Sequence, residues 1–189
     1  TASDDYEVRI SEAVPGSGFP YFYSLGLNAG ERADLKEIVQ WGTIHWSSMT
    51  SSFRNLKNME LTASDVPDMS GVSDLSFMFL SSTGMTGSTA NWAWNTATIT
   101  NMKSVFNDAQ AFNGDVSSWN TASVTNMNSM FRGAGQFNYN IGGWNTSNVT
   151  DMYQMFQNAN SFDQNIGSWN LSNLTTASAM FIAAPGNGM

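Results

Sequence analysis

The chain has 189 residues, of which 41% are hydrophobic and 12% are charged, against about a quarter charged in ordinary domains. Its formal net charge of −8 would repel the phosphate backbone of a nucleic acid, so no nucleic-acid partner is expected. The lack of cysteine excludes disulfides, thiolate catalysis and cysteine-bound zinc, and no run of about 20 apolar residues predicts a membrane span.

Residues 1–35 come before any internal repetition and carry signals for two strands. Tyr6, Val8 and Ile10 alternate with polar neighbours, which is typical of a half-buried strand. An aromatic segment over residues 19–27 follows a Pro-Gly-Ser-Gly turn and predicts a second strand. We expect residues 1–35 to form a β-rich N-terminal cap that covers the apolar end of the following repeats.

A repeat occupies the rest of the chain, with a period of 25 residues in its second half and of 26 and 27 residues between the upstream copies. Its most regular mark is a tryptophan, at Trp94, Trp119, Trp144 and Trp169. The positions between them also recur, with methionine at Met102, Met127 and Met152 and phenylalanine at Phe106, Phe131, Phe156 and Phe181. Weaker copies lie upstream, where Phe53 and Phe79 occupy the phenylalanine position. The sequence therefore predicts about six turns over residues 36–184, followed by a C-terminal tail at 185–189.

Within one repeat, the spacing of apolar residues predicts a short helix and then a short strand. Met102, Val105, Phe106 and Ala109 follow the i, i+3, i+4, i+7 pattern of a helix face, which predicts a helix over residues 100–109. Aromatic and β-branched residues broken by Asn, Gly and Ser predict a strand and turn over residues 112–119. Stacked strands of this kind would form a parallel sheet, and the Trp, Met and Phe positions would form its core.

The repeat resembles a known family. The pattern W-N-T-[AS]-x-V-T-[ND]-M-x-x-M-F, followed by F-[ND]-x-[DN]-I-x-x-W, is similar to the BspA-type leucine-rich-like repeats of bacterial surface proteins and mycoplasma lipoproteins, over roughly residues 36–184. The resemblance implies an α/β repeat solenoid, a right-handed leucine-rich-repeat-like stack with short parallel strands. It also implies display outside the cell, adhesion to protein or cell partners, and no shared catalytic motif.

Polar residues in the predicted strand segment form the first candidate binding surface. They recur at two positions of the repeat: Asn113, Asp115, Asn138, Asn140, Asp163 and Asn165. A regular row of carbonyl and carboxylate oxygens suits Ca²⁺ or a glycan. The acidic position is not kept from repeat to repeat, however, because Asn140 and Asn165 replace Asp115, so a solvated polar face is the other interpretation. No other cofactor is expected.

Two further surfaces are candidates. On the predicted helix, two positions of the repeat vary: one holds Lys103, Asn128 and Tyr153, and the other holds Asn107, Arg132 and Gln157. Such variation is typical of a recognition surface and equally of an unconstrained surface. At the C-terminal end, Met180, Phe181 and Ile182 would have no following turn to cover them. An uncovered apolar end favours contact with another copy of the chain.

The sequence offers little for catalysis. His45 is the only histidine and lies beside the predicted core residue Trp46. Two carboxylate pairs, Asp65 with Asp68 and Glu31 with Asp34, could act on a glycoside, but no further sign of an active site surrounds them. We therefore expect a non-catalytic, extracellular binding or adhesion module that presents a polar face to a protein or glycan. The alternative is a structural subunit or decoration protein of a surface filament or virus particle, which joins copies of itself through its uncapped end.

Overall fold

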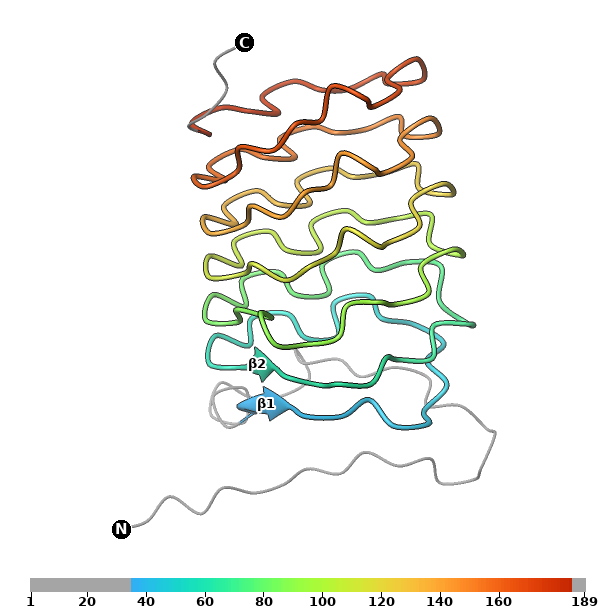
Figure 1. The fold of residues 1–189 in the computed structure, drawn as a ribbon, viewed down its shortest axis with the longest axis vertical. Helices are drawn as coiled ribbons and strands as arrows, with labels where there is room; N and C mark the ends of the chain where they lie inside the picture. The colour runs from blue at the N-terminus through green and yellow to red at the C-terminus, as the bar shows by residue number, and fades with distance from the viewer. Residues whose placement is uncertain (1–34, 185–189) are drawn as a thin grey trace.

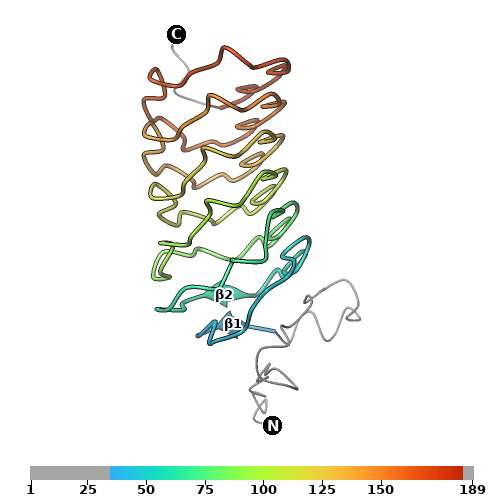
Figure 2. The ribbon, with the colours of Figure 1, turned by 90° about the vertical axis from the view of Figure 1, so that its right-hand side faces the viewer.

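The computed structural model describes residues 35–184, and the chain there forms coils stacked along one axis (Figure 1). The view from the side shows the same order, with successive coils following one another from β1 toward the C-terminal end (Figure 2). The predicted N-terminal strands, the carboxylate pair Glu31 and Asp34, and the C-terminal tail lie outside the described residues.

Regular secondary structure is scarce between residues 35 and 184. Strand β1 (Glu37–Ile38) pairs in parallel with strand β2 (Glu60–Leu61), and this part of the chain contains no helix. Beyond these strands, isolated parallel bridges link successive coils at Asp74, Asn101, Asn126, Asp151 and Thr176. The predicted α/β repeat solenoid of leucine-rich-repeat type, with about six turns and a helix and strand in each, is therefore wrong.

The predicted helix over residues 100–109 is replaced by a run of tight turns. In a helix, each backbone N–H would bond the carbonyl four residues earlier. Here the N–H of Phe106 donates to the carbonyl of Met130 at 2.9 Å, and that of Asp108 donates to Arg132 at 2.6 Å. The N–H of Ala109 instead donates to Phe106, three residues back, at 3.1 Å. Alternate N–H groups thus bond the next coil, and the others close turns.

This pattern needs a left-handed backbone at two positions of every coil. Ser104 and Asp108 have φ values of 54° and 55°. The equivalent positions in the other coils share a positive φ: Ser51 and Asn55, Phe77 and Ser81, Ser129 and Gly133, Gln154 and Asn158, Ala179 and Ala183. A side chain in this conformation costs roughly 1–2 kcal/mol, so the bonds between coils and the packing of the core must offset a repeated local strain.

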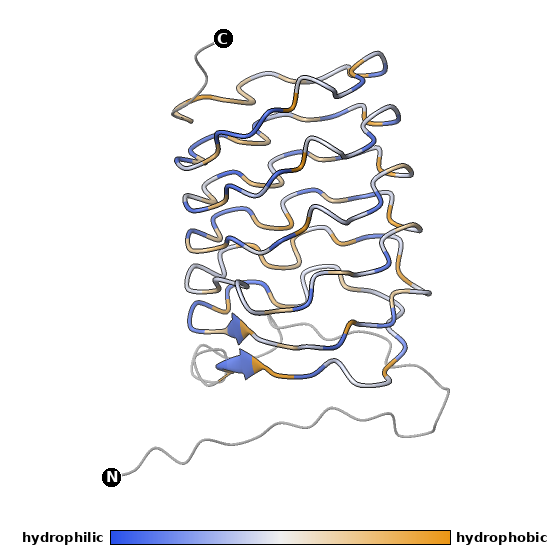
Figure 3. Cartoon of the chain, viewed as in Figure 1, coloured by the Kyte–Doolittle hydropathy of each residue, from blue (hydrophilic) through white to orange (hydrophobic). Residues whose placement is uncertain are grey.

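The predicted strand over residues 112–119 is also absent. The N–H of Val116 donates to the carbonyl of Gly114, and that of Trp119 donates to Val116, both at 3.1 Å. These are bonds within tight turns, so this segment does not pair with its neighbours as a sheet. Figure 3 shows hydrophilic and hydrophobic residues interleaved along the coils.

The predicted core is confirmed. Phe106, Phe131 and Phe156 are fully buried, and their rings stack from coil to coil with centroids 5.6 and 5.8 Å apart. A second row of stacked rings, Phe112, Phe137 and Phe162, has a spacing of 5.8 Å. Stacked aromatic pairs add to the free energy gained by burying their area. The apolar spacing therefore identified the buried residues although it gave the wrong backbone.

The tryptophans also bond between coils. The indole N–H of Trp119 donates to the carbonyl of Trp92 at 2.9 Å. Those of Trp144 and Trp169 donate to the carbonyls of Val116 and Ile141 at 3.2 and 3.1 Å. Each bond satisfies a carbonyl inside the core, so the tryptophan period has a polar as well as an apolar cause.

Replacing a strained left-handed residue by glycine should stabilise the stack. Gln154 has a φ of 54°, so Gln154→Gly should raise the free energy of unfolding by about 1 kcal/mol in urea titrations. Gln110 is exposed and is not among the residues with positive φ. Gln110→Gly should therefore lower the free energy of unfolding by about 0.5–1 kcal/mol. Equal destabilisation by both changes would contradict the left-handed assignment.

Candidate binding face

The six polar residues of the first candidate surface lie in two columns along the stack. The first column contains Asn113, Asn138 and Asp163. The side-chain oxygen of Asn113 accepts the backbone N–H of Asn138 at 3.0 Å, and that of Asn138 accepts the N–H of Asp163 at 2.9 Å. These side chains therefore join one coil to the next, a role that the sequence pattern did not reveal.

The second column contains Asp115, Asn140 and Asn165, all exposed. In each, Oδ1 accepts the backbone N–H two residues later, which is an Asx turn. The donors are Ser117, Gly142 and Gly167, at 3.0, 2.9 and 2.9 Å. The turn fixes the side chain, so its remaining polar atoms have defined positions.

The bonds leave a regular set of polar groups for solvent or a ligand. The Nδ2 amides of Asn113, Asn138, Asn140 and Asn165 have no hydrogen-bond partner within residues 35–184. The row also keeps the second oxygen of Asp115 and both side-chain oxygens of Asp163. We call these six residues the amide row. Its donors outnumber its carboxylates, which favours a ligand rich in oxygen acceptors.

The row has few of the features of a calcium site. In the described part of the chain, no three His, Cys, Asp or Glu side chains are grouped as metal ligands. The Oδ1 atoms of Asn140 and Asn165 already accept backbone hydrogen bonds, whereas calcium needs six to eight oxygen ligands. The calcium hypothesis remains a prediction without structural support.

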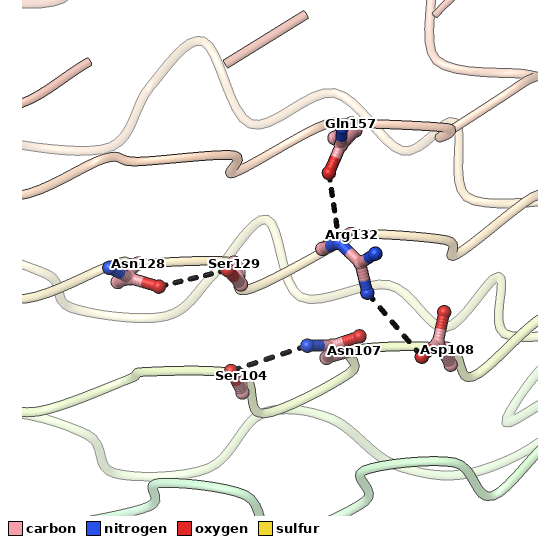
Figure 4. Close-up of polar contacts among 7 residues, drawn as sticks. All are labelled: Ser104, Asn107, Asp108, Asn128, Ser129, Arg132 and Gln157. Atoms are coloured by element: carbon pink, nitrogen blue, oxygen red, sulfur yellow. Dashed lines mark hydrogen bonds and ion pairs between the residues drawn. The ribbon is translucent and has the colours of Figure 1, made fainter. Parts of the chain in front are cut away.

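The second candidate surface is a network that runs along the stack (Figure 4). Arg132 donates from Nε to Oε1 of Gln157 on the next coil at 2.9 Å. Its Nη1 lies 3.6 Å from Oδ2 of Asp108 on the preceding coil, and the Arg132 and Asp108 side chains are 34% and 45% exposed. Exposed ion pairs contribute little to stability, so this network mainly fixes the direction of the arginine.

The other variable position also makes contacts within the stack. Asn128 accepts a hydrogen bond from the hydroxyl of Ser129 at 2.8 Å (Figure 4). It also donates from Nδ2 to Oδ2 of Asp151 on the next coil at 3.0 Å. Lys103 places its Nζ 5.6 Å from the ring centroid of Phe77, within cation–π range. Several variable residues thus form contacts with other residues of the stack, which makes them less suitable for binding a partner.

The carboxylates considered for catalysis hold the backbone. Asp65 accepts the N–H groups of Trp41 and Gly42, at 2.9 and 2.8 Å. Asp68 contacts His45 and accepts the N–H of Ser70 at 2.9 Å. Hydrogen bonds from Ser70, and then the neighbouring His45, hold the pKa of Asp68 below its ordinary value. Each carboxylate therefore has a structural role in this part of the stack.

Glu60 is a structural carboxylate that sequence reasoning missed. Burial raises its pKa, but hydrogen bonds from the hydroxyl and N–H of Thr86 and the N–H groups of Gly87 and Leu61 outweigh burial and lower it. The four donors lie 2.7–2.9 Å from the carboxylate oxygens. The Gly87 carbonyl in turn accepts the indole N–H of Trp92 at 2.7 Å. Glu60 therefore anchors the irregular loop that opens the regular repeats.

The comparisons with known proteins assign a family. Residues 28–93 and 92–187 each match the family model described as Mycoplasma protein of unknown function, DUF285. The two matches together cover most of the chain, so the protein belongs to this family. No curated protein and no solved structure matches the chain. Within residues 35–184, no helix has the length and apolar character needed to cross a membrane.

The Glu60 contacts predict a pH-dependent stability. Because the folded pKa of Glu60 lies below its ordinary value of 4.5, its contribution is complete above that value and is lost as the pH falls through the folded pKa. Glu60→Gln should lower the free energy of unfolding near pH 7 by roughly 1 kcal/mol, and the difference should shrink under acid conditions.

A matched control is available in the preceding coil. Glu37 is exposed and accepts one hydrogen bond, from the hydroxyl of Thr62. Glu37→Gln should change the unfolding free energy less than Glu60→Gln does. A difference for Glu60→Gln that stayed constant from neutral to acid pH would contradict the assigned role of the carboxylate.

Proposed function

We propose that the protein is a non-catalytic, extracellular binding or adhesion module of the BspA type, and that the amide row contacts its protein or glycan partner. The observation that carries the proposal is the repeated combination of a fixed side-chain oxygen and an unpaired amide nitrogen in the row. Asn140 and Asn165 have it in successive coils, each through the same Asx turn. Such a row offers the same donor to a ligand several times over.

Fixed side chains favour binding for a physical reason. A mobile side chain loses roughly 0.5–1.5 kcal/mol of conformational freedom when a ligand immobilises it. At Asn138, Asn140 and Asn165 the backbone bonds have already restricted the side chain. Weak contacts repeated along the stack can add through multivalency. A ligand with repeated hydroxyl or carbonyl oxygens, such as a glycan or an extended polypeptide, fits this arrangement.

Location and the lack of catalysis rest on separate support. The resemblance of the repeat to BspA-type surface proteins supports display outside the cell, on a cell or virion surface. The backbone bonds accepted by Asp65, Asp68 and Glu60 support a structural role for these carboxylates.

Substitutions of asparagine by aspartate separate binding from folding. Asn140→Asp with Asn165→Asp keeps the Oδ1 atoms of both Asx turns but removes both amide donors. The double variant should bind at least about tenfold more weakly to any ligand found on a glycan array or on immobilised matrix proteins, since two hydrogen bonds are lost. Thermal unfolding should stay close to that of the parent chain.

The control is Asn145→Asp. Asn145 is exposed and forms the same Asx turn, with the N–H of Ser147 at 3.1 Å, but lies outside the amide row. This variant carries the same kind of charge change and should keep full binding. Equal loss of binding in Asn145→Asp and in the double variant would show a general charge effect. Failure of the parent chain to bind any array component would remove the basis of the proposal.

A second function is favoured by the C-terminal end of the stack. The backbone N–H groups of Ala177, Ala179, Phe181 and Ala183 have no acceptor within the described residues. The equivalent N–H groups one coil earlier, from Met152 to Asn158, all donate to the next coil. Of the predicted contact residues, Met180 is buried, Phe181 stacks on Phe156 and Ile182 is 55% exposed.

Open donors beside an exposed apolar side chain suit a structural subunit or decoration protein that joins copies of itself at this end. Light scattering over a wide concentration range tests this alternative. Assembly that grows with concentration and is weakened by Ile182→Asp, but not by the same change at the exposed Tyr153 on the side of the stack, would support it. A persistent monomer would exclude it.

A further inference from the structure

Four Asn-x-Ser/Thr tripeptides occur in the chain, and all lie in its last two complete repeats. They begin at Asn145, Asn148, Asn170 and Asn173. This tripeptide is the acceptor for N-linked glycans in secreted proteins. The sequence motif alone does not distinguish the four asparagines, but their contacts do.

Asn145 and Asn170 have the groups that such a modification needs. Both are exposed, and their Oδ1 atoms accept the N–H of Ser147 and Ser172 at 3.1 and 3.0 Å. Within residues 35–184, the Nδ2 atoms of both asparagines and the hydroxyls of both serines have no hydrogen-bond partner. The asparagine is thus held by its oxygen, while the nitrogen that would receive a sugar is available.

In Asn148 and Asn173, by contrast, the side-chain nitrogen Nδ2 already has a hydrogen-bond partner. Their Nδ2 atoms donate to the backbone carbonyls of Ala122 and Ser147 on the preceding coil, each at 2.7 Å. The hydroxyls two residues later are engaged as well, since Thr150 and Thr175 donate to carbonyls of the preceding coil at 3.1 and 2.8 Å. A sugar on either nitrogen would disturb a bond that joins two coils.

We propose that Asn145 and Asn170 are acceptor sites for an N-linked glycan, and that Asn148 and Asn173 are not modified in the folded chain. The donor is an oligosaccharide linked to a lipid diphosphate. Nδ2 forms a bond to the anomeric carbon, the bond from that carbon to the phosphate oxygen breaks, Nδ2 loses one proton and the lipid diphosphate leaves. This inference rests on the extracellular location in the proposed function.

Earlier coils provide a natural comparison. Asn95 and Asn120 form the same Asx turn, with the N–H groups of Ala97 and Ala122 at 3.3 and 3.0 Å. Alanine has no hydroxyl, so these positions lack the acceptor tripeptide. Ala122→Ser restores the hydroxyl in an otherwise equivalent turn. It should therefore create a new acceptor at Asn120.

The test uses the purified, folded full chain, treated with an oligosaccharyltransferase and a synthetic lipid-linked oligosaccharide. Peptide mass spectrometry then measures the occupancy of each asparagine. Asn145 and Asn170 should be modified about tenfold faster than Asn148 and Asn173, because modification of the latter breaks a hydrogen bond between coils. In the Ala122→Ser chain, Asn120 should be modified as well.

The urea-unfolded chain is the control for differences between the four tripeptides themselves. In that chain all four asparagines should react at comparable rates. Equal rates at the four sites of the folded chain, or no reaction at Asn145 and Asn170 in either state, would overturn the proposal. The reaction is carried out in vitro, so its failure leaves the ligand-binding proposal standing. Conversely, if the array experiment found no ligand for the chain, the rates of glycosylation measured at the four asparagines would still stand.

Discussion

The structure depends on one interaction, the hydrogen bond that every second backbone N–H of the Met-Phe segment (residues 102–108 and their equivalents in the other coils) donates to a carbonyl of the next coil. Phe106 donates to Met130, and Phe131 donates to Met155, both at 2.9 Å. These bonds set the register of the coils, so equivalent aromatic rings fall directly over one another, 5.6–5.8 Å apart. They also require the two left-handed residues of each coil. A regular helix would use the same N–H groups internally and remove these bonds between coils.

The same constraint shapes the surface. With the backbone in irregular turns, many N–H groups outside the Met-Phe segment lack a main-chain acceptor, and asparagine oxygens supply it. Asn113 does so between coils and Asn140 within a turn. An asparagine whose oxygen is used in this way still has its nitrogen. The outer face therefore carries amide donors in fixed places, both in the proposed binding row and at Asn145 and Asn170.

Sequence reasoning located the core and the polar columns because both follow the period of the repeat. Met102, Phe106 and Ala109 are buried as their spacing predicted. The backbone could not be predicted in this way, because a run of tight turns with buried residues at these positions has the same apolar spacing as a helix. The deciding partner, a carbonyl 24 residues away, gives no local signal. A hint was available in the Asp, Asn or Gly at Asn55, Asp108, Gly133 and Asn158, since these residue types tolerate a left-handed backbone. Glu60 was missed because its loop occurs once and has no counterpart in the regular repeats.

The most direct test of this account is to detect the hydrogen bond itself, through NMR scalar couplings between backbone nitrogen and carbonyl carbon. The structure predicts a coupling from the nitrogen of Phe106 to the carbonyl carbon of Met130, across the gap between coils. A coupling from Phe106 to the carbonyl of Met102, four residues earlier, would instead show a helix and would contradict the account.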